Sequence, residues 1–156
     1  MYGNTPSVCV DTSVFGGAFD PEFSLASKLF FQQVRLGLFD VTVPALVSDE
    51  LTHASERISC LFHDLEPFLG LVEIDVAAFS LRRAYLAAGV VSPKWSADAL
   101  HVAVATVAGC RAIVSWNFKH IVNFRRIPLY NGVNQSEGYG PIAIHTPQEV
   151  IFDEEE

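Results

Sequence analysis

Two hydrophobic periods alternate along the chain. Short, nearly continuous apolar runs are bounded by polar or turn-forming residues, and between them apolar residues recur every three to four positions. The short runs are typical of buried strands, whereas the longer period is typical of helices with one buried face. The runs predict strands at residues 7–10, 39–43, 71–74, 112–115 and 142–144.

Helices are predicted between these strands, at residues 21–36, 45–55, 56–65, 76–88, 96–108 and 117–123, with a last helical turn from Pro147. Ser96 and Gly109 are typical of the start and the end of a helix. Residues 130–141 contain three glycines and two asparagines, which predicts a loop. Strands that alternate with helices predict a three-layer α/β/α fold around a central parallel sheet of about five strands.

Length and composition narrow the class of protein. The chain has 156 residues, which suits a single domain over residues 1–156. No apolar run reaches the roughly 18 residues that cross a bilayer, and no secretory signal pattern is present. The cysteines Cys9, Cys60 and Cys110 are far apart in apolar stretches, which is typical of reduced thiols. We therefore expect a cytoplasmic protein with no membrane association.

The formal net charge is −8, and the last four residues are all acidic. Broad, non-specific binding to a nucleic-acid backbone requires a basic surface, so this charge argues against it. A nuclease remains compatible with the charge if cations bridge its acids to phosphate. Such an enzyme should grip its substrate locally.

Asp11 is the first candidate site residue, because it directly follows the first predicted strand. The crevice outside the carboxyl ends of parallel strands is the usual ligand site in such sheets. Thr12 or Ser13 could orient the carboxylate, or simply hydrogen-bond a turn. Asx residues also open ordinary turns after strands, so this position alone leaves both interpretations open.

Glu50 is the second candidate. The buried stripe of the helix predicted after Pro44 consists of Leu46, Val47, Leu51 and Ala54. At about 100° per residue, Glu50 lies within the arc of that stripe, whereas Asp49 points away from it. A carboxylate on an apolar face is costly unless a metal or another group pairs with it.

Asp98 interrupts an almost entirely apolar helix, together with His101 one turn later. An acid in a first turn also favours the helix dipole by about 0.3–1 kcal/mol, which is the alternative explanation. His101 is more typical of a hydrogen-bonded core group than of a metal ligand. Asn117 follows the fourth strand and either completes a cation site or caps the next helix. His120 and Trp116 are expected to pack or cap.

The segments that carry these residues resemble those of the PIN domain, the metal-dependent ribonuclease fold of many VapC-type toxins. The matching segments are residues 8–13, 43–50, 96–101 and 113–117. The likeness extends over most of the chain, including the closing strand and Pro147. By this resemblance Asp11, Glu50 and Asp98 take the places of three family acids, and Asn117 stands where the family often has a fourth.

The resemblance implies an enzyme that hydrolyses RNA phosphodiester bonds with Mg²⁺ or Mn²⁺, held by Asp11, Glu50, Asp98 and Asn117. Clustered carboxylates repel one another, and a divalent cation relieves that repulsion. The resemblance also implies an antitoxin protein that silences the enzyme. The competing interpretation is an inactive or weak PIN-like module that binds RNA or a protein, since Asn117 removes one charge. A receiver-type phospho-acceptor domain would need an acidic pair at the first strand, which is missing.

Family members often form dimers, and the phenylalanines of the chain favour the same expectation. Phe15, Phe19 and Phe23 lie around the first loop, where they could form an apolar surface. We also expect that Phe30 and Phe31, as neighbours, cannot both face the core of one helix. A homodimer is therefore predicted.

Overall fold

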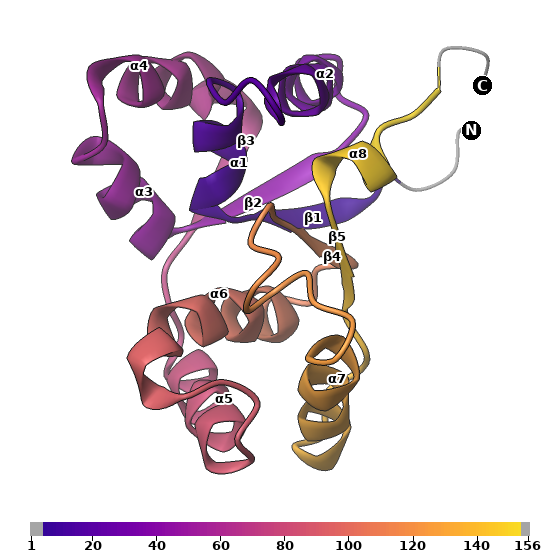
Figure 1. Ribbon diagram of the computed structural model, residues 1–156. Helices are drawn as coiled ribbons and strands as arrows, with labels where there is room; N and C mark the ends of the chain where they lie inside the picture. The colour runs from indigo at the N-terminus through magenta and orange to yellow at the C-terminus, as the bar shows by residue number, and fades with distance from the viewer. Residues whose placement is uncertain (1–4, 154–156) are drawn as a thin grey trace.

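The computed structural model describes residues 5–153. Its centre is one five-stranded sheet in which every strand pairing is parallel, in the order β3-β2-β1-β4-β5 (Figure 1). The strands are β1 (Ser7–Val10), β2 (Asp40–Pro44), β3 (Leu69–Val72), β4 (Ala112–Val114) and β5 (Ala143–His145). Helices cover both faces of the sheet, so the predicted three-layer α/β/α architecture, PIN-like in its strand number, is confirmed.

Buried strands explain the short apolar runs of the sequence. In β1, Val8 and Val10 belong to the core on one face of the sheet, whereas Cys9 belongs to the core on the other face. Successive side chains of a strand point to opposite faces, and both faces are covered by helices here. The three fully buried positions of the central strand are therefore apolar.

One face of the sheet carries an aromatic layer (Figure 1). Its helices are α1 (Thr12–Gly17), α2 (Ser24–Arg35), α3 (Ala45–Thr52), α4 (Glu56–Leu65) and the short α8 (Pro147–Val150). Phe15 packs on Phe31 at 4.9 Å between ring centroids, and Phe30 packs on Phe39 at 5.0 Å. The expectation that Phe30 and Phe31 could not both be buried is wrong, because rings from outside α2 cover both of them.

The other face carries α5 (Val76–Ala87), α6 (Ser96–Val107) and α7 (Ile127–Ser136), which form the polar-linked layer (Figure 1). Small apolar residues of α6 pack against the sheet, and buried hydrogen bonds join the three helices. The Tyr85 hydroxyl donates to Asn134 Oδ1 at 2.5 Å, and Asn134 Nδ2 donates to Thr106 Oγ1 at 3.3 Å. Two 3₁₀ turns, η1 (Glu66–Phe68) and η2 (Pro93–Trp95), precede β3 and α6.

Three local predictions are wrong. Residues 130–141 were expected to be a loop, but α7 continues to Ser136 because buried Tyr130 and Asn134 hold it against the layer. The loop expected after β1 is the helix α1, which Asp11 caps. The helix expected over residues 117–123 is instead a series of turns.

Gly17 ends α1 in close contact with β4. A Cβ atom at this position would lie 2.7 Å from the ring of Trp116. Only glycine therefore allows the start of the chain and the end of β4 to approach this closely. Within residues 5–153, no helix combines the length and the hydropathy required to cross a membrane.

Candidate active site at the switch point of the sheet

The candidate site lies where the strand order reverses. The chain continues from β1 to β2 and β3 on one side, and it returns to pair β4 with the other side of β1. In sheets of this kind ligands bind in the crevice expected at such a reversal, outside the carboxyl ends of the strands, which here are β1 and β4. Asp11 directly follows β1, and its backbone N–H donates to the carbonyl of Val114 at 3.1 Å.

Asp11 is a buried carboxylate, with only 5 % of its surface exposed. Oδ1 accepts the backbone N–H of Ser13 at 3.2 Å, and Oδ2 accepts the Ser13 hydroxyl at 2.9 Å. The Ser115 hydroxyl also donates to Oδ2. These bonds make Asp11 the N-cap of α1, and they fix the orientation of its carboxylate.

The two serines connect β1 and β4 around Asp11. The backbone N–H of Trp116 donates to Ser13 Oγ at 2.9 Å, and that of Asn117 donates to Ser115 Oγ at 2.9 Å. Ser115 was not predicted as a site residue. Its signal in the sequence is a small hydroxyl residue directly after a buried strand, which is the position of Asp11 in β1.

Glu50 projects from α3 toward the same crevice. Thr12 Oγ1 donates to Glu50 Oε2 at 2.5 Å, and His101 Nε2 lies 3.6 Å from Oε1. The side chain is 41 % exposed, so Glu50 is not buried as the helical stripe suggested. Partial burial raises the pKa of Glu50, but the contacts with His101 and Thr12 outweigh it and leave the pKa below its usual value.

His101 lies at the centre of the acids. It is buried, and its Nδ1 has no hydrogen-bond partner among the described residues. Burial lowers the pKa of His101, but Glu50 and the negative charges of Asp11 and Asp98 raise it above its usual value. All three predicted acids thus raise the pKa of one imidazole, and they come from the end of β1, from α3 and from α6.

Asp98 occupies the first turn of α6 and is 24 % exposed. Its Oδ2 lies 2.9 Å from Nδ1 of His120, a buried histidine. The ring of Trp95 stacks on His120 with 4.3 Å between centroids, and the Tyr130 hydroxyl donates to the His120 carbonyl at 2.8 Å. The expectation that His120 packs is confirmed, and the packing places it against Asp98.

Asn117 begins the turn that carries His120. Its Oδ1 accepts the backbone N–H groups of Lys119 at 3.2 Å and of His120 at 2.9 Å. The capping interpretation is therefore correct for the turn, although no helix follows. Through Ser115, Asn117 is joined to Asp11.

The arrangement fits a hard divalent cation by its ligand chemistry, since carboxylate and amide oxygens suit Mg²⁺ and Mn²⁺. As the side chains lie, however, residues 5–153 contain no group of three or more His, Cys, Asp or Glu side chains that could hold a metal ion together. Glu50 and Asp98 each contact a histidine instead. Binding of one cation by three of these side chains would therefore require them to move closer together than they lie here.

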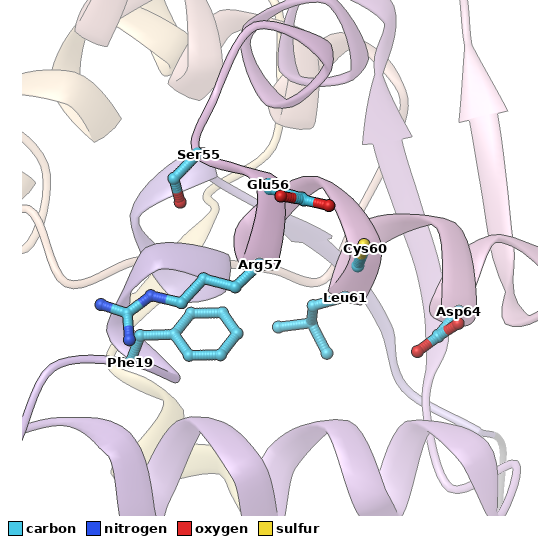
Figure 2. A pocket seen from close by; sticks show the side chains of 7 residues that line it. All are labelled: Phe19, Ser55, Glu56, Arg57, Cys60, Leu61 and Asp64. Atoms are coloured by element: carbon cyan, nitrogen blue, oxygen red, sulfur yellow. The ribbon is translucent and has the colours of Figure 1, made fainter.

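A groove of about 710 Å³ lies elsewhere, over α4 and the segment between α1 and α2 (Figure 2). It is lined by Phe19, Ser55, Glu56, Arg57, Cys60, Leu61 and Asp64. The Arg57 guanidinium lies over the Phe19 ring, 4.9 Å from its centroid. None of the four predicted site residues is in this lining, so the groove is separate from the candidate site.

Comparison with solved structures supports the fold. VapBC2 from Rickettsia felis, in a crystal structure bound to a DNA fragment from their promoter, contains a chain that is similar to this one with a TM-score of 0.56. The match covers 90 % of this chain and 98 % of that chain at 12 % sequence identity, a level that speaks for the fold alone. No protein-family model matches the chain, and no curated protein matches it in sequence.

Proposed function

We propose that this chain is a Mg²⁺- or Mn²⁺-dependent ribonuclease that hydrolyses RNA phosphodiester bonds. The observation that carries the proposal is the convergence of Asp11, Glu50 and Asp98 on His101 at the switch point of the sheet. The charges of these three acids, which come from distant parts of the sequence, all act on that buried imidazole. Histidines pair with Glu50 and Asp98, but within residues 5–153 Asp11 has no basic partner, so this group of carboxylates favours a cation site.

In this proposal Asp11 and Asp98 are the principal ligands of the cation. Glu50 either ligates it or orients a water molecule, and Asn117 completes the shell through its amide oxygen. A bound cation supplies a water of lowered pKa and stabilises charge on phosphate oxygens. Ser13 and Ser115 hold Asp11 in place, and His101 and His120 restrain Glu50 and Asp98.

A non-catalytic module is the second candidate. It is favoured by a specific observation, since Glu50 and Asp98 each contact a histidine and the Asn117 amide oxygen accepts two backbone N–H groups. In that case the same fold binds RNA or a protein without cutting RNA. The two candidates differ in whether any RNA is hydrolysed when Mn²⁺ is present.

The partners are also part of the proposal. The similar chain comes from a structure of VapBC2 bound to promoter DNA, which supports a toxin–antitoxin role with an antitoxin protein as partner. A homodimer is proposed from the family resemblance. Of the phenylalanines expected to form an apolar surface, Phe15, Phe30 and Phe31 do not contribute to it, because they are buried in the core. Phe19 and Phe23 are half-buried, with Phe19 under Arg57 and Phe23 stacked on Trp116. Sedimentation at micromolar concentration tests the dimer, and a monomer alone would contradict it.

Cleavage of RNA with Mn²⁺ tests the enzyme. We expect Asp11→Asn and Asp98→Asn to lose more than about 100-fold in rate, because neighbours cannot replace a ligand. His101→Ala and His120→Ala should lose about 10–100-fold, as is typical of groups that orient ligands. Asp64→Asn, in the separate groove, is the matched control and should keep full activity. An unaltered protein that binds RNA but never cuts it would favour the second candidate.

A further inference from the structure

A compact group of basic and aromatic side chains borders Asp98, although the chain as a whole is acidic. We call Lys94, Trp95 and Lys119 the Trp95 patch. The ammonium groups of Lys94 and Lys119 lie over the Trp95 ring, at 5.2 and 5.7 Å from its centroid. Within residues 5–153 neither lysine forms an ion pair with a carboxylate, because all the ion pairs there use histidine.

The patch is built on a fixed support. Trp95 stacks on buried His120, and the backbone of the adjacent residue Lys119 is held by Arg126, whose Nε donates to the Lys119 carbonyl at 2.9 Å. A second nitrogen of Arg126 donates to the carbonyl of Val90 at 3.2 Å, in the segment that leads to η2. The turn with Lys119 and the segment with Trp95 are therefore tied together.

We propose that the Trp95 patch binds single-stranded RNA next to the candidate active site, a proposal that rests on the function proposed above. The indole is partly exposed, and both lysines that lie over it are exposed. An unpaired base that stacks on the indole would displace the two ammonium groups from the ring, and they can then bind the flanking phosphates. Bases in a duplex do not offer their faces, so the ligand is single-stranded.

The location connects the patch to the chemistry. Trp95 contacts His120, and His120 contacts Asp98 at 2.9 Å, so two side chains separate a base on Trp95 from the Asp98 carboxylate. The net charge of −8 opposes long-range attraction of RNA. Two lysines at one tryptophan supply the local positive charge that an acidic protein needs to bind RNA.

Binding of a labelled 12-nucleotide oligouridylate, measured by fluorescence anisotropy in EDTA, tests the proposal without requiring cleavage. Trp95→Ala should weaken binding by about 5- to 150-fold, the range for loss of one stacked base. Trp95→Phe should lose less, since it keeps a ring. Lys94→Ala with Lys119→Ala should make the salt dependence shallower by about 1.4 in log–log slope, for two phosphate contacts with a single strand.

The control is a second aromatic–basic pair on α5, where the Arg82 guanidinium lies over the Phe79 ring at 5.3 Å. Phe79→Ala and Arg82→Ala should leave binding unchanged. Because Trp95 also packs against the core, the lysine variants provide a test that does not depend on its packing.

The outcomes separate this proposal from the proposed function. Patch variants that bind RNA like the unaltered protein, while RNA is still cut with Mn²⁺, would overturn the patch alone. An unaltered protein that neither binds nor cuts the oligouridylate would overturn both. The RNA assignment would be overturned if poly-glutamate bound as tightly as RNA and the same variants lost that binding. The patch would then be a surface for acidic proteins.

Discussion

The two helical layers are held to the sheet by different kinds of contact. The aromatic layer is built from phenylalanine rings in tilted and edge-to-face contact, with no hydrogen bond needed between them. The polar-linked layer packs small α6 residues on the sheet and joins its helices through Tyr85, Asn134 and Thr106. The candidate site straddles both, since Glu50 comes from the first layer and Asp98 from the second. The element that carries Glu50 is therefore stabilised by the packing of aromatic rings. The element that carries Asp98 is stabilised by small side chains on the sheet and by buried hydrogen bonds between helices.

Removal of a central ring should be the most damaging change. Phe31→Ala is expected to lower the free energy of unfolding by about 3–5 kcal/mol, because it leaves a cavity in the aromatic layer. Urea denaturation measures the effect. Leu25→Ala, on an exposed position of the same helix, should change stability by no more than about 0.5 kcal/mol. Equal effects of the two substitutions would show that ring packing does not hold this layer.

A cation at the site should stabilise the fold by joining the layers. At a Mg²⁺ or Mn²⁺ concentration of about 100 times its dissociation constant, the free energy of unfolding should rise by about 2.7 kcal/mol. Asp98→Asn should lose most of this gain, and Asp64→Asn should keep it. A melting temperature that responds to neither ion in the unaltered protein would count heavily against the cation.

Substitutions in the buried hydrogen bond between Tyr85 and Asn134 should lower stability by a different mechanism from substitutions of the phenylalanine rings. Tyr85→Phe or Asn134→Leu alone should cost about 1–3 kcal/mol, because each leaves a buried polar group without its partner. The double variant should cost less than the sum of the two. Chemical denaturation of all three variants gives the coupling. Strict additivity would mean that the hydrogen bond does not link α5 to α7.

The smallest expected effect concerns the contact between Glu50 and His101. The pKa of His101 is raised above its ordinary value of 6.5, so its contribution to stability is present below that pH and is lost as the pH rises through the raised value. Because Glu50 is half exposed, the loss should stay below about 1 kcal/mol. We expect the difference in stability between unaltered protein and His101→Gln to narrow as the pH rises above the ordinary pKa of 6.5, without metal. A difference in the free energy of unfolding that stays constant with pH would contradict this prediction. His53→Gln, at an exposed histidine, is the control.

The sequence predicted the strands better than the connections between them. Apolar runs marked all five strands to within two residues at most ends, because burial on both faces leaves a strong signal. The helix α7 was missed, since Asn134 is favourable there only through partners in α5 and α6 that no local pattern reveals. The close approach of Gly17 to the ring of Trp116 joins residues far apart in sequence, so no local pattern could predict it.

For the site, the sequence predicted three acids on separate elements but not the contacts that each of them makes. The charges of Asp11, Glu50 and Asp98 all act on the buried imidazole of His101, and their role as site residues stays a prediction. Contacts between Glu50 and His101 and between Asp98 and His120 depend on side chains far apart in sequence, so spacing could not predict them. Ser115 was missed because a single serine after a strand is common.

The reversal of the sheet order at β1 also determines when the site exists during synthesis. Asp11 and Glu50 leave the ribosome early, and β1, β2 and β3 can pair with one another within the first half of the chain. Ser115 lies 104 residues after Asp11 and meets it only when β4 pairs with the free side of β1. Because such distant pairing forms late, a nascent chain carries its acids unassembled until the last third of the protein has folded.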